Sequence, residues 1–477
     1  MMESVKQFVG PSLMVAVIIF LYVTSIASAT QLVIGTAAAC LLGLIPANAY
    51  FPPVWFRLNL FVCLYNLYCS ELVGYRWLRF LIHKRYSVPH SDYRHGVRCL
   101  SGNIITRCPF PPHVLKGSEF HTRGGGTVDL KHLGEKCREG CYDGVFVMPV
   151  PVLLDNYAYF ILSCKTKRCA VVDPADPTLV LNMLEVVRNL TQIDFMITDI
   201  LTTHKHWDHA GGNMEMRALS QCSSERCRAL LSPELNIYGS EVDRPHACNK
   251  LIKGSDELIV AGGGAKVVVL STPGHTGGSV MFLVGDALPK EGEPQRLALF
   301  TGDCVFCGGC GALFEATSVD ETLETVDIFN NNRTWVHPAT GDIIHTDDVL
   351  IYVGHEYTER SLDMILSVQR TANQTGEQSA IATSNYCDTV AQARNGARRL
   401  RSCVVADDVY MKVTSMETKA PLHLRACTVP STVTIEKKVN ALLSLKRCVL
   451  EEFQGKPYAS MAVQRAIYTS TKRNDRG

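Results

Sequence analysis

Short apolar runs separated by turn-forming pairs dominate the middle of the chain. Pairs such as Asp155-Asn156 and Asp173-Pro174 separate these runs, as expected between successive strands. Pro177–Leu190 instead repeats its apolar residues at helical spacing. Nearly all-apolar strands mixed with helices indicate an α/β protein whose sheets are covered on both faces. The predicted strands are Val145–Val152, Tyr157–Leu162, Cys169–Asp173, Met196–Thr202, Val267–Ser271, Val280–Val284, Leu297–Phe300 and Leu350–Val353.

The N-terminal end has a different pattern, since no Lys, Arg, Asp or Glu occurs from Gln7 to Phe56. Apolar runs fill Leu13–Ala29 and Gln31–Ala49, and a third covers Leu58–Val73. Runs of this kind suit a hydrocarbon core of about 30 Å, in which a charged side chain is costly. We therefore expect residues 1–86 to form a membrane-anchoring region with two or three transmembrane segments, in contact with membrane lipid.

Basic residues after the last apolar run predict how the chain is oriented in the membrane. They are Arg76, Arg79, Lys84, Arg85 and Arg94. By the positive-inside tendency, the rest of a multi-pass protein then faces the cytoplasm or the matching side of an organelle membrane such as the mitochondrial one. A cleaved signal peptide is the alternative, because Ala27-Ser28-Ala29 resembles a cleavage site. The second apolar run that follows at once favours retained segments.

The remaining chain changes composition at three places, and each change suggests a boundary. A basic, glycine-rich stretch precedes the strands, and a stretch rich in Gln, Thr, Ser, Asn and Arg follows them. Apolar residues at helical spacing return near Val439. The predicted parts are a flexible linker at 87–143, a folded α/β domain at 144–369, a polar insertion at 370–427 and a helical region at 428–477 that packs on the domain.

Composition excludes some classes of function. The 47 basic and 46 acidic residues of the 477-residue chain give a net charge of +1, so we expect no nucleic-acid partner. The 19 cysteines are scattered and odd in number, unlike a small disulfide scaffold. We interpret most of them as free thiols in a reducing compartment.

The segment Thr203–Asn213, which reads T-H-K-H-W-D-H-A-G-G-N, carries the strongest chemical signal. It follows a predicted strand, so its polar side chains lie in a loop at a strand end. His204 and His206 are two residues apart and project toward one cation, whereas Asp208 and His209 reach a second. Imidazole and carboxylate groups are ligands for zinc, iron or manganese.

Three further motifs repeat one arrangement, in which an apolar strand and a glycine precede a metal-competent side chain. T-P-G-H-T contains His275, T-G-D contains Asp303, and G-H-E-Y-T contains His355. Each residue alone is more often a capping or core residue than a ligand. Because loops at one edge of a sheet converge, we expect the three to join the first segment in one site.

These motifs resemble the metallo-β-lactamase superfamily, and within it the glyoxalase II (hydroxyacylglutathione hydrolase) branch. The resemblance runs from about Val145 to Tyr357 and rests on the four motifs together with Gly309-Cys310-Gly311. It implies an αββα sandwich and two divalent ions, zinc foremost, with iron and manganese as alternatives. It also implies hydrolysis of a thioester or ester by a hydroxide between the ions, with Asp208 and Asp303 as catalytic residues. The implied ligands are His204, His206 and His275 for the first ion, Asp208, His209 and His355 for the second, and Asp303 for both.

The sequence departs from glyoxalase II in the segment that contacts the substrate. The family has a basic residue and a tyrosine after Gly-Cys-Gly, where this chain has Ala312 and Phe314, while Tyr357 is kept. We expect Tyr357, Phe314 and Ala312 to contact a hydroxyacylglutathione-like acyl thioester or an ester. The loss of charged contacts to glutathione and the apolar segment after Gly-Cys-Gly favour a more apolar acyl group. The alternatives are a persulfide dioxygenase with one iron and a membrane-tethered scaffold with a vestigial site.

Overall fold

The computed structural model describes residues 113–114, 130–153, 155–289, 295–331, 334–375, 384–402, 427–444 and 450–469. All of them belong to the unit Ser91–Gly477. The predicted membrane-anchoring region at 1–86 lies outside the described residues. Among the residues that are described, no helix is long and apolar enough to cross a membrane.

The first sheet has seven strands in chain order, from β1 to β7. The first four strands pair antiparallel, and β4 to β7 pair parallel. Every residue of β3 is buried, as its apolar sequence predicts for a strand covered on both faces. The strands are β1 (His113–Val114), β2 (Val145–Val152), β3 (Asn156–Ser163), β4 (Arg168–Val172), β5 (Met196–Leu201), β6 (Leu231–Ser240) and β7 (Lys250–Ile252).

The second sheet has six strands in the order β13-β12-β11-β10-β9-β8. Its strands pair antiparallel except for the parallel pair β11 and β12. The strands are β8 (Glu257–Val260), β9 (Ala265–Ser271), β10 (Val280–Asp286), β11 (Leu297–Gly302), β12 (Val349–Val353) and β13 (Ser431–Thr432).

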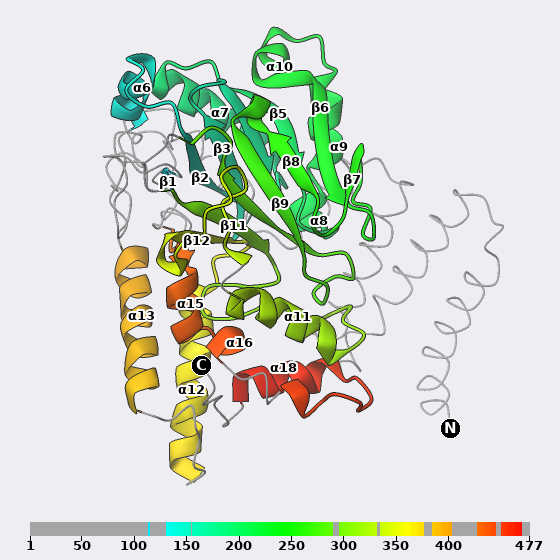
Figure 1. The fold of residues 1–477 in the computed structure, drawn as a ribbon, viewed down its shortest axis with the longest axis vertical. Helices are drawn as coiled ribbons and strands as arrows, with labels where there is room; N and C mark the ends of the chain where they lie inside the picture. The colour runs from blue at the N-terminus through cyan, green and yellow to red at the C-terminus, as the bar shows by residue number, and fades with distance from the viewer. Residues whose placement is uncertain are drawn as a thin grey trace, which may run out of the picture. The chain divides into compact units, whose positions relative to one another are not determined.

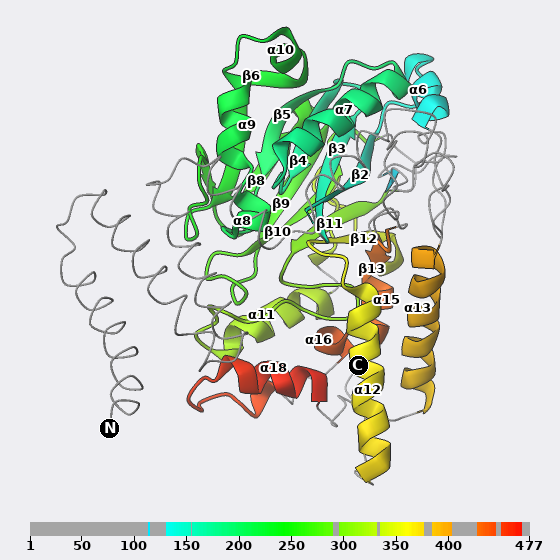
Figure 2. The same ribbon diagram turned by 180° about the vertical axis from the view of Figure 1, so that it is seen from behind.

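The two sheets pack face to face around an aromatic core. The ring of Tyr159 on β3 lies 5.3 Å from the rings of both Phe300 on β11 and Tyr352 on β12. Helix α7 packs on the first sheet, and the C-terminal helices gather at one end of the sandwich (Figures 1 and 2). The helices are α6 (Leu130–Arg138), α7 (Pro177–Thr191), α8 (Trp207–Ala210), α9 (Asn213–Ser220), α10 (Glu225–Leu230), α11 (Val319–Asn330), α12 (Thr358–Thr375), α13 (Ser384–Ser402), α15 (Val433–Val439), α16 (Ala441–Ser444) and α18 (Ser460–Thr469).

Part of the predicted linker at 87–143 is ordered, which corrects that prediction where the structure describes it. Helix α6 buries Leu130 and Leu133, and it packs beside α7. Cys137 at its end forms a disulfide with Cys164, which follows β3. This disulfide joins residues 27 positions apart. The ten other cysteines among the described residues form no disulfide, in line with the prediction that most of the cysteines are free thiols.

The predicted polar insertion at 370–427 also contains a helix. Helix α13 packs against α12, with Cys387, Val390 and Ala397 on its buried side. Its arginines pair with carboxylates of α12: Arg394 with Asp363, and Arg398 with both Glu359 and Asp363. Two arginines of the predicted polar insertion therefore connect a pair of helices. The helical region predicted at 428–477 contains the short helices α15, α16 and α18, and an extended backbone at Asn440 separates α15 from α16.

Candidate metal centre

Three histidines from two loops converge on one point. His204 and His206 lie between β5 and α8, and His275 follows β9. The Nδ1 atom of His206 is 3.0 Å from His204 Nε2 and 2.9 Å from His275 Nε2. His204 and His275 are buried and His206 is partly buried, so the three nitrogens face one another away from bulk water.

A second cluster lies beside the first and shares a carboxylate with it. Asp208 and His209 on α8 meet His355, which follows β12, with their ligand atoms within 4.8 Å of one another. Asp303 stands between the clusters, with its oxygens 3.1 Å from His209 Nε2, 3.4 Å from His275 Nε2 and 3.2 Å from His355 Nε2. The structure thus brings together all seven residues predicted from the motifs.

Two glycines allow the strand ends to approach this closely. A Cβ atom on Gly302, which has a φ of +49°, would lie 2.6 Å from Thr203 Oγ1. A Cβ atom on Gly354 would lie 2.2 Å from Asp303 Oδ1. Both contacts are shorter than packed atoms tolerate. The glycines that precede the ligands in these motifs therefore make room for neighbouring parts of the site.

In four of the histidines, the ring nitrogen that faces away from the centre is within hydrogen-bond distance of an oxygen atom. The Nδ1 partners are Thr203 Oγ1 for His204 at 3.0 Å, Asp173 Oδ2 for His209 at 2.9 Å, the Ala312 carbonyl for His275 at 2.7 Å and Asp155 Oδ1 for His355 at 2.9 Å. Where Nδ1 donates to its oxygen, Nε2 keeps its lone pair and points into the centre. His206 is the exception, since its Nδ1 atom faces the cluster.

The electrostatics of the centre couple its carboxylates to its histidines. Burial lowers the pKa of His206 to about 4, so its ring is neutral at neutral pH. Burial also acts to lower the pKa of His209, but Asp303 and Asp208 raise that pKa to about 10. Burial acts to raise the pKa of Asp303, whereas His355 and His209 hold it well below its usual range. The metal-free centre therefore holds anionic carboxylates next to a protonated histidine. A divalent cation bound there would replace the proton and neutralise the carboxylates.

The donor set fits divalent metal ions. Zinc–nitrogen bonds of about 2.05 Å at tetrahedral angles place two ligand nitrogens about 3.3 Å apart. The nitrogens in the first cluster are 2.9 and 3.0 Å apart, and Asp303 lies 3.1–3.4 Å from three Nε2 atoms. Neutral imidazoles whose lone pairs face one another at this distance repel unless a cation lies between them. Histidine nitrogens and carboxylate oxygens are the usual ligands of zinc, iron and manganese.

Three residues that support the centre were missed as site residues by the sequence analysis. Asp155, Asn156 and Asp173 were interpreted only as turn formers between strands. Asp173 is buried, and its two oxygens accept from the amide and hydroxyl of Thr203 and contact His209. Asp173 directly follows an apolar strand, as Asp303 nearly does, and this position was the signal that pointed to a role in the site.

The predicted substrate contacts lie on opposite sides of the centre. The ring of Phe314 is 69% exposed, and its centroid is 5.4 Å from that of His275 and 6.1 Å from that of His206. Tyr357 stacks on His355 with a centroid distance of 4.8 Å and an interplanar angle of 8°. Ala312 contributes its carbonyl to His275, and its side chain is only a methyl group.

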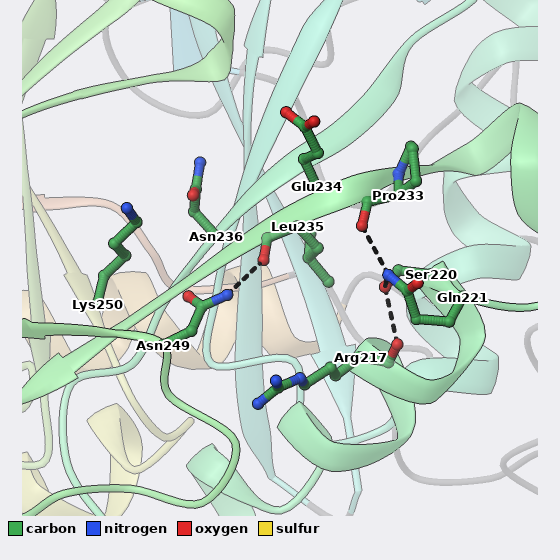
Figure 3. A pocket seen from close by; sticks show the side chains of 9 residues that line it. All are labelled: Arg217, Ser220, Gln221, Pro233, Glu234, Leu235, Asn236, Asn249 and Lys250. Atoms are coloured by element: carbon green, nitrogen blue, oxygen red, sulfur yellow. Dashed lines mark hydrogen bonds between the residues drawn. The ribbon is translucent and has the colours of Figure 1, made fainter.

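A separate surface cavity of about 370 Å³ lies along α9, β6 and β7 (Figure 3). None of the seven clustered residues lines it. Two of the polar side chains that line this cavity donate hydrogen bonds to other lining residues. Asn249 donates to the Leu235 carbonyl at 2.9 Å, and Gln221 donates to the Pro233 carbonyl at 2.7 Å. We assign the chemistry to the histidine and aspartate clusters.

The fold and the centre define a metal-dependent hydrolase of the metallo-β-lactamase class. The sequence profile of the metallo-β-lactamase superfamily matches residues 152–288. The hydroxyacylglutathione hydrolase of Dictyostelium discoideum is 32% identical over 226 residues, which cover 47% of this chain and 70% of that protein. The cytoplasmic hydroxyacylglutathione hydrolase of Arabidopsis thaliana is 33% identical over 223 residues, covering 47% of this chain and 72% of that protein. This chain therefore belongs to the glyoxalase II branch of the superfamily, whose members are metal-dependent thioester hydrolases.

Solved structures with a detectable likeness are more distant. A metallo-β-lactamase from Staphylococcus aureus subsp. aureus COL has a TM-score of 0.37 and 17% identity, covering 69% of this chain and 74% of that chain. ETHE1 from Myxococcus xanthus has a TM-score of 0.34 and 18% identity, covering 66% of this chain and 94% of that chain.

Proposed function

We propose that the protein hydrolyses an acyl thioester at a two-ion centre. The observation that carries this proposal is the pair of clusters that share Asp303. When bound, the ions supply a Lewis acid and lower the pKa of water from about 15.7 to about 7. The residues that would hold the first ion are His204, His206 and His275, those for the second are Asp208, His209 and His355, and Asp303 would contact both. Zinc is the proposed metal, with iron and manganese as alternatives.

The chain's own residues orient the centre and leave nucleophilic attack to water. Hydrogen bonds at the outer histidine nitrogens hold the rings in place before substrate binds. Cys304 directly follows Asp303, but burial raises the pKa of its thiol to about 12, so it is protonated at neutral pH. A protonated thiol is a poor nucleophile, which argues against a covalent cysteine intermediate.

We propose further that the preferred thioester carries less negative charge near the first ion than hydroxyacylglutathione does. Phe314 offers an exposed apolar ring at this side of the centre, and Ala312 carries no charge. Lys205, between two of the ligands, is held by Glu315 at 2.7 Å and lies 3.6 Å from Asp243. Its charge is already neutralised. A charge-assisted hydrogen bond to a substrate carboxylate is worth about 1.5–3 kcal/mol, so its absence weakens glutathione binding by about one to two orders of magnitude.

The test compares the hydrolysis of lactoylglutathione with that of longer acyl thioesters by the zinc-loaded protein. We expect higher kcat/KM for the longer, less charged substrates. Ala312→Lys should raise kcat/KM for lactoylglutathione about tenfold or more, whereas Ala312→Met, which adds length without charge, should not. A wild-type preference for lactoylglutathione would overturn the substrate assignment. Oxygen consumption with a persulfide and a single bound iron would instead support the dioxygenase hypothesis.

We propose that residues 1–86 anchor the enzyme in a membrane. The support is the absence of charge from Gln7 to Phe56 and the basic residues that follow the apolar runs. The full chain should stay with membranes during alkaline carbonate extraction. A double variant, Val17→Arg with Leu41→Arg, should be released, because a charge within the hydrocarbon core is costly. Release of the unaltered chain would contradict the anchor.

A further inference from the structure

The turn between β2 and β3 contacts one half of the metal centre and not the other. We propose that Asp155 and Asn156 are positioning residues that set the affinity of the second metal site, formed by Asp208, His209 and His355, independently of the first. This inference rests on the proposed two-ion function, and it assigns the control of ion number to a pair of residues outside the ligand set.

Asp155 determines which nitrogen of His355 faces the centre. Its Oδ1 atom lies 2.9 Å from His355 Nδ1, and the ring is buried. A proton on Nδ1 that is donated to this carboxylate leaves the lone pair on Nε2, which points toward Asp208 and Asp303 at 3.4 and 3.2 Å. The negative charge of Asp155 also makes the ring a more basic ligand.

Asn156 supports Asp208 of the same cluster and lies beside His355. Its Nδ2 atom is 3.1 Å from Asp208 Oδ2, 3.2 Å from the Asp208 carbonyl oxygen and 3.3 Å from His355 Nε2. Asn156 is 4% exposed, so water cannot easily replace these contacts. The two amide hydrogens suffice for Asp208, so Asn156 fixes this carboxylate beside His355 and leaves the Nε2 lone pair for the metal.

The main chain anchors this turn without the help of the two side chains. Glu356 N donates to the Asp155 carbonyl at 2.8 Å, and Tyr157 N donates to the Gly354 carbonyl at 2.9 Å. Asn156 and His355 also form an antiparallel bridge. Side-chain truncation at the turn should therefore leave the backbone in place and change only the support of the ligands.

Asp243 supports the first site in the corresponding way. Its carboxylate accepts from Lys205 N at 3.0 Å, from Thr276 Oγ1 at 2.6 Å and from Gly278 N at 2.9 Å. It thus ties the loop of His204 and His206 to the loop of His275. The side chains of Asp155 and Asn156 contact only ligands of the second cluster, so the two supports act on different ions.

The experiment measures both zinc affinities by chelator competition, with total metal content after dialysis as a second readout. Asp155→Ala and Asn156→Ala should each raise the zinc dissociation constant of the second site by about 10- to 100-fold. The dissociation constant of the first site should change by less than about threefold. Asp155→Asn should fall between wild type and Asp155→Ala, because it keeps an acceptor and loses the charge. Asp243→Asn is the matched control and should weaken the first site more than the second.

Each outcome decides a separate question. Equal loss of both ions in the Asp155 and Asn156 variants, or loss of neither, would overturn the inference. Circular dichroism of the metal-free variants checks that they fold; if the Asp155 variants unfold, Asn156→Ala alone carries the test. A wild-type protein that binds one zinc ion would contradict the two-ion function itself. A protein that binds two but hydrolyses no thioester would contradict only the proposed reaction.

Discussion

Asp173 shows how one buried carboxylate joins the fold to the chemistry. Three donors point at its two oxygens: the amide and the hydroxyl of Thr203, and Nδ1 of His209. Thr203 opens the ligand loop, so the same carboxylate sets the start of the loop and the orientation of a ligand. A solvent-exposed side chain at this position would not do the same, because the oxygen acceptors must be held in place before a metal binds.

We predict that Asp173→Asn destabilises the metal-free protein by about 1–3 kcal/mol. An asparagine offers one oxygen where the carboxylate offers two, so a buried donor loses its acceptor. Urea unfolding of the metal-free variant measures the change. Asp194→Asn is the control, since Asp194 pairs with Arg188 at the surface and its side chain is 88% exposed; its effect should stay below about 1 kcal/mol. Equal effects of the two substitutions would contradict the role of Asp173.

The seven clustered residues could be predicted because each is a metal-competent side chain placed just after an apolar strand. The residues that support them could not be separated from ordinary turns by the same reasoning. Asp and Asn are common in turns for reasons of backbone geometry, so Asp155 and Asn156 carry no distinct signal. Only the position of Asp173 directly after a buried strand resembles that of the ligands.

At the scale of elements, helix α13 is the largest departure from what the sequence predicts. Its surface is dominated by arginine and other polar residues, and its buried side consists of small residues such as Cys387 and Ala397. Hydrophobic periodicity detects large apolar residues best, so this pattern is weak. The ion pairs of Arg394 and Arg398 with α12 appear only once both helices are formed.

A glycine within α13 gives a direct test of the helix. A Cβ atom on Gly396 would meet nothing within 4 Å. We predict that Gly396→Ala stabilises the protein by about 0.5–1 kcal/mol, because alanine loses less backbone entropy in a helix interior. Thermal unfolding measures the gain. Gly354→Ala is the opposing control, since its Cβ atom would collide with Asp303. No gain from Gly396→Ala would contradict the helix and favour a solvated loop.

Strands were predicted where their apolar residues form an uninterrupted run, and β6 was missed because polar residues interrupt its run. Strand β2 has the predicted bounds Val145–Val152, and β5, β9, β10, β11 and β12 overlap the predicted runs. Strand β6 was not predicted, because Pro233, Glu234 and Asn236 interrupt its apolar residues. It pairs with β5 on one edge and β7 on the other, so tertiary pairing rather than local pattern defines it.

At the scale of the whole described domain, the C-terminal helices take part in building the site. Asn440 donates to the carbonyls of Phe306 and Gly309 at 2.8 and 2.9 Å, and Glu436 accepts from Gly308 N at 2.8 Å. The ring of Phe306 in turn lies 5.7 Å from His355. A segment more than 70 residues beyond the last ligand in the chain therefore fixes one wall beside the second cluster.

The two metal sites differ in the protons that they must release, which predicts a pH dependence of metal content. In the first cluster, burial lowers the pKa of His204 and brings that of His206 to about 4, so both rings are neutral at pH 7. In the second, the pKa of His209 is about 10, and that of His355 is also raised by Asp303 against the effect of burial. Below these raised pKa values the rings are protonated in the metal-free protein, and a metal must displace the protons.

We therefore predict that the second ion dissociates first as the pH falls. Each proton displaced makes metal affinity fall about tenfold per pH unit below the pKa of the group that carried it. The first site should lose its ion at a lower pH than the second, because burial lowers the pKa of both His204 and His206. Zinc content after equilibration from pH 8 to pH 5 measures the order of loss. Calorimetry in buffers of different ionisation enthalpy measures the protons released. Loss of both ions at the same pH, or no proton release at pH 7, would contradict the assignment of charge to the second cluster.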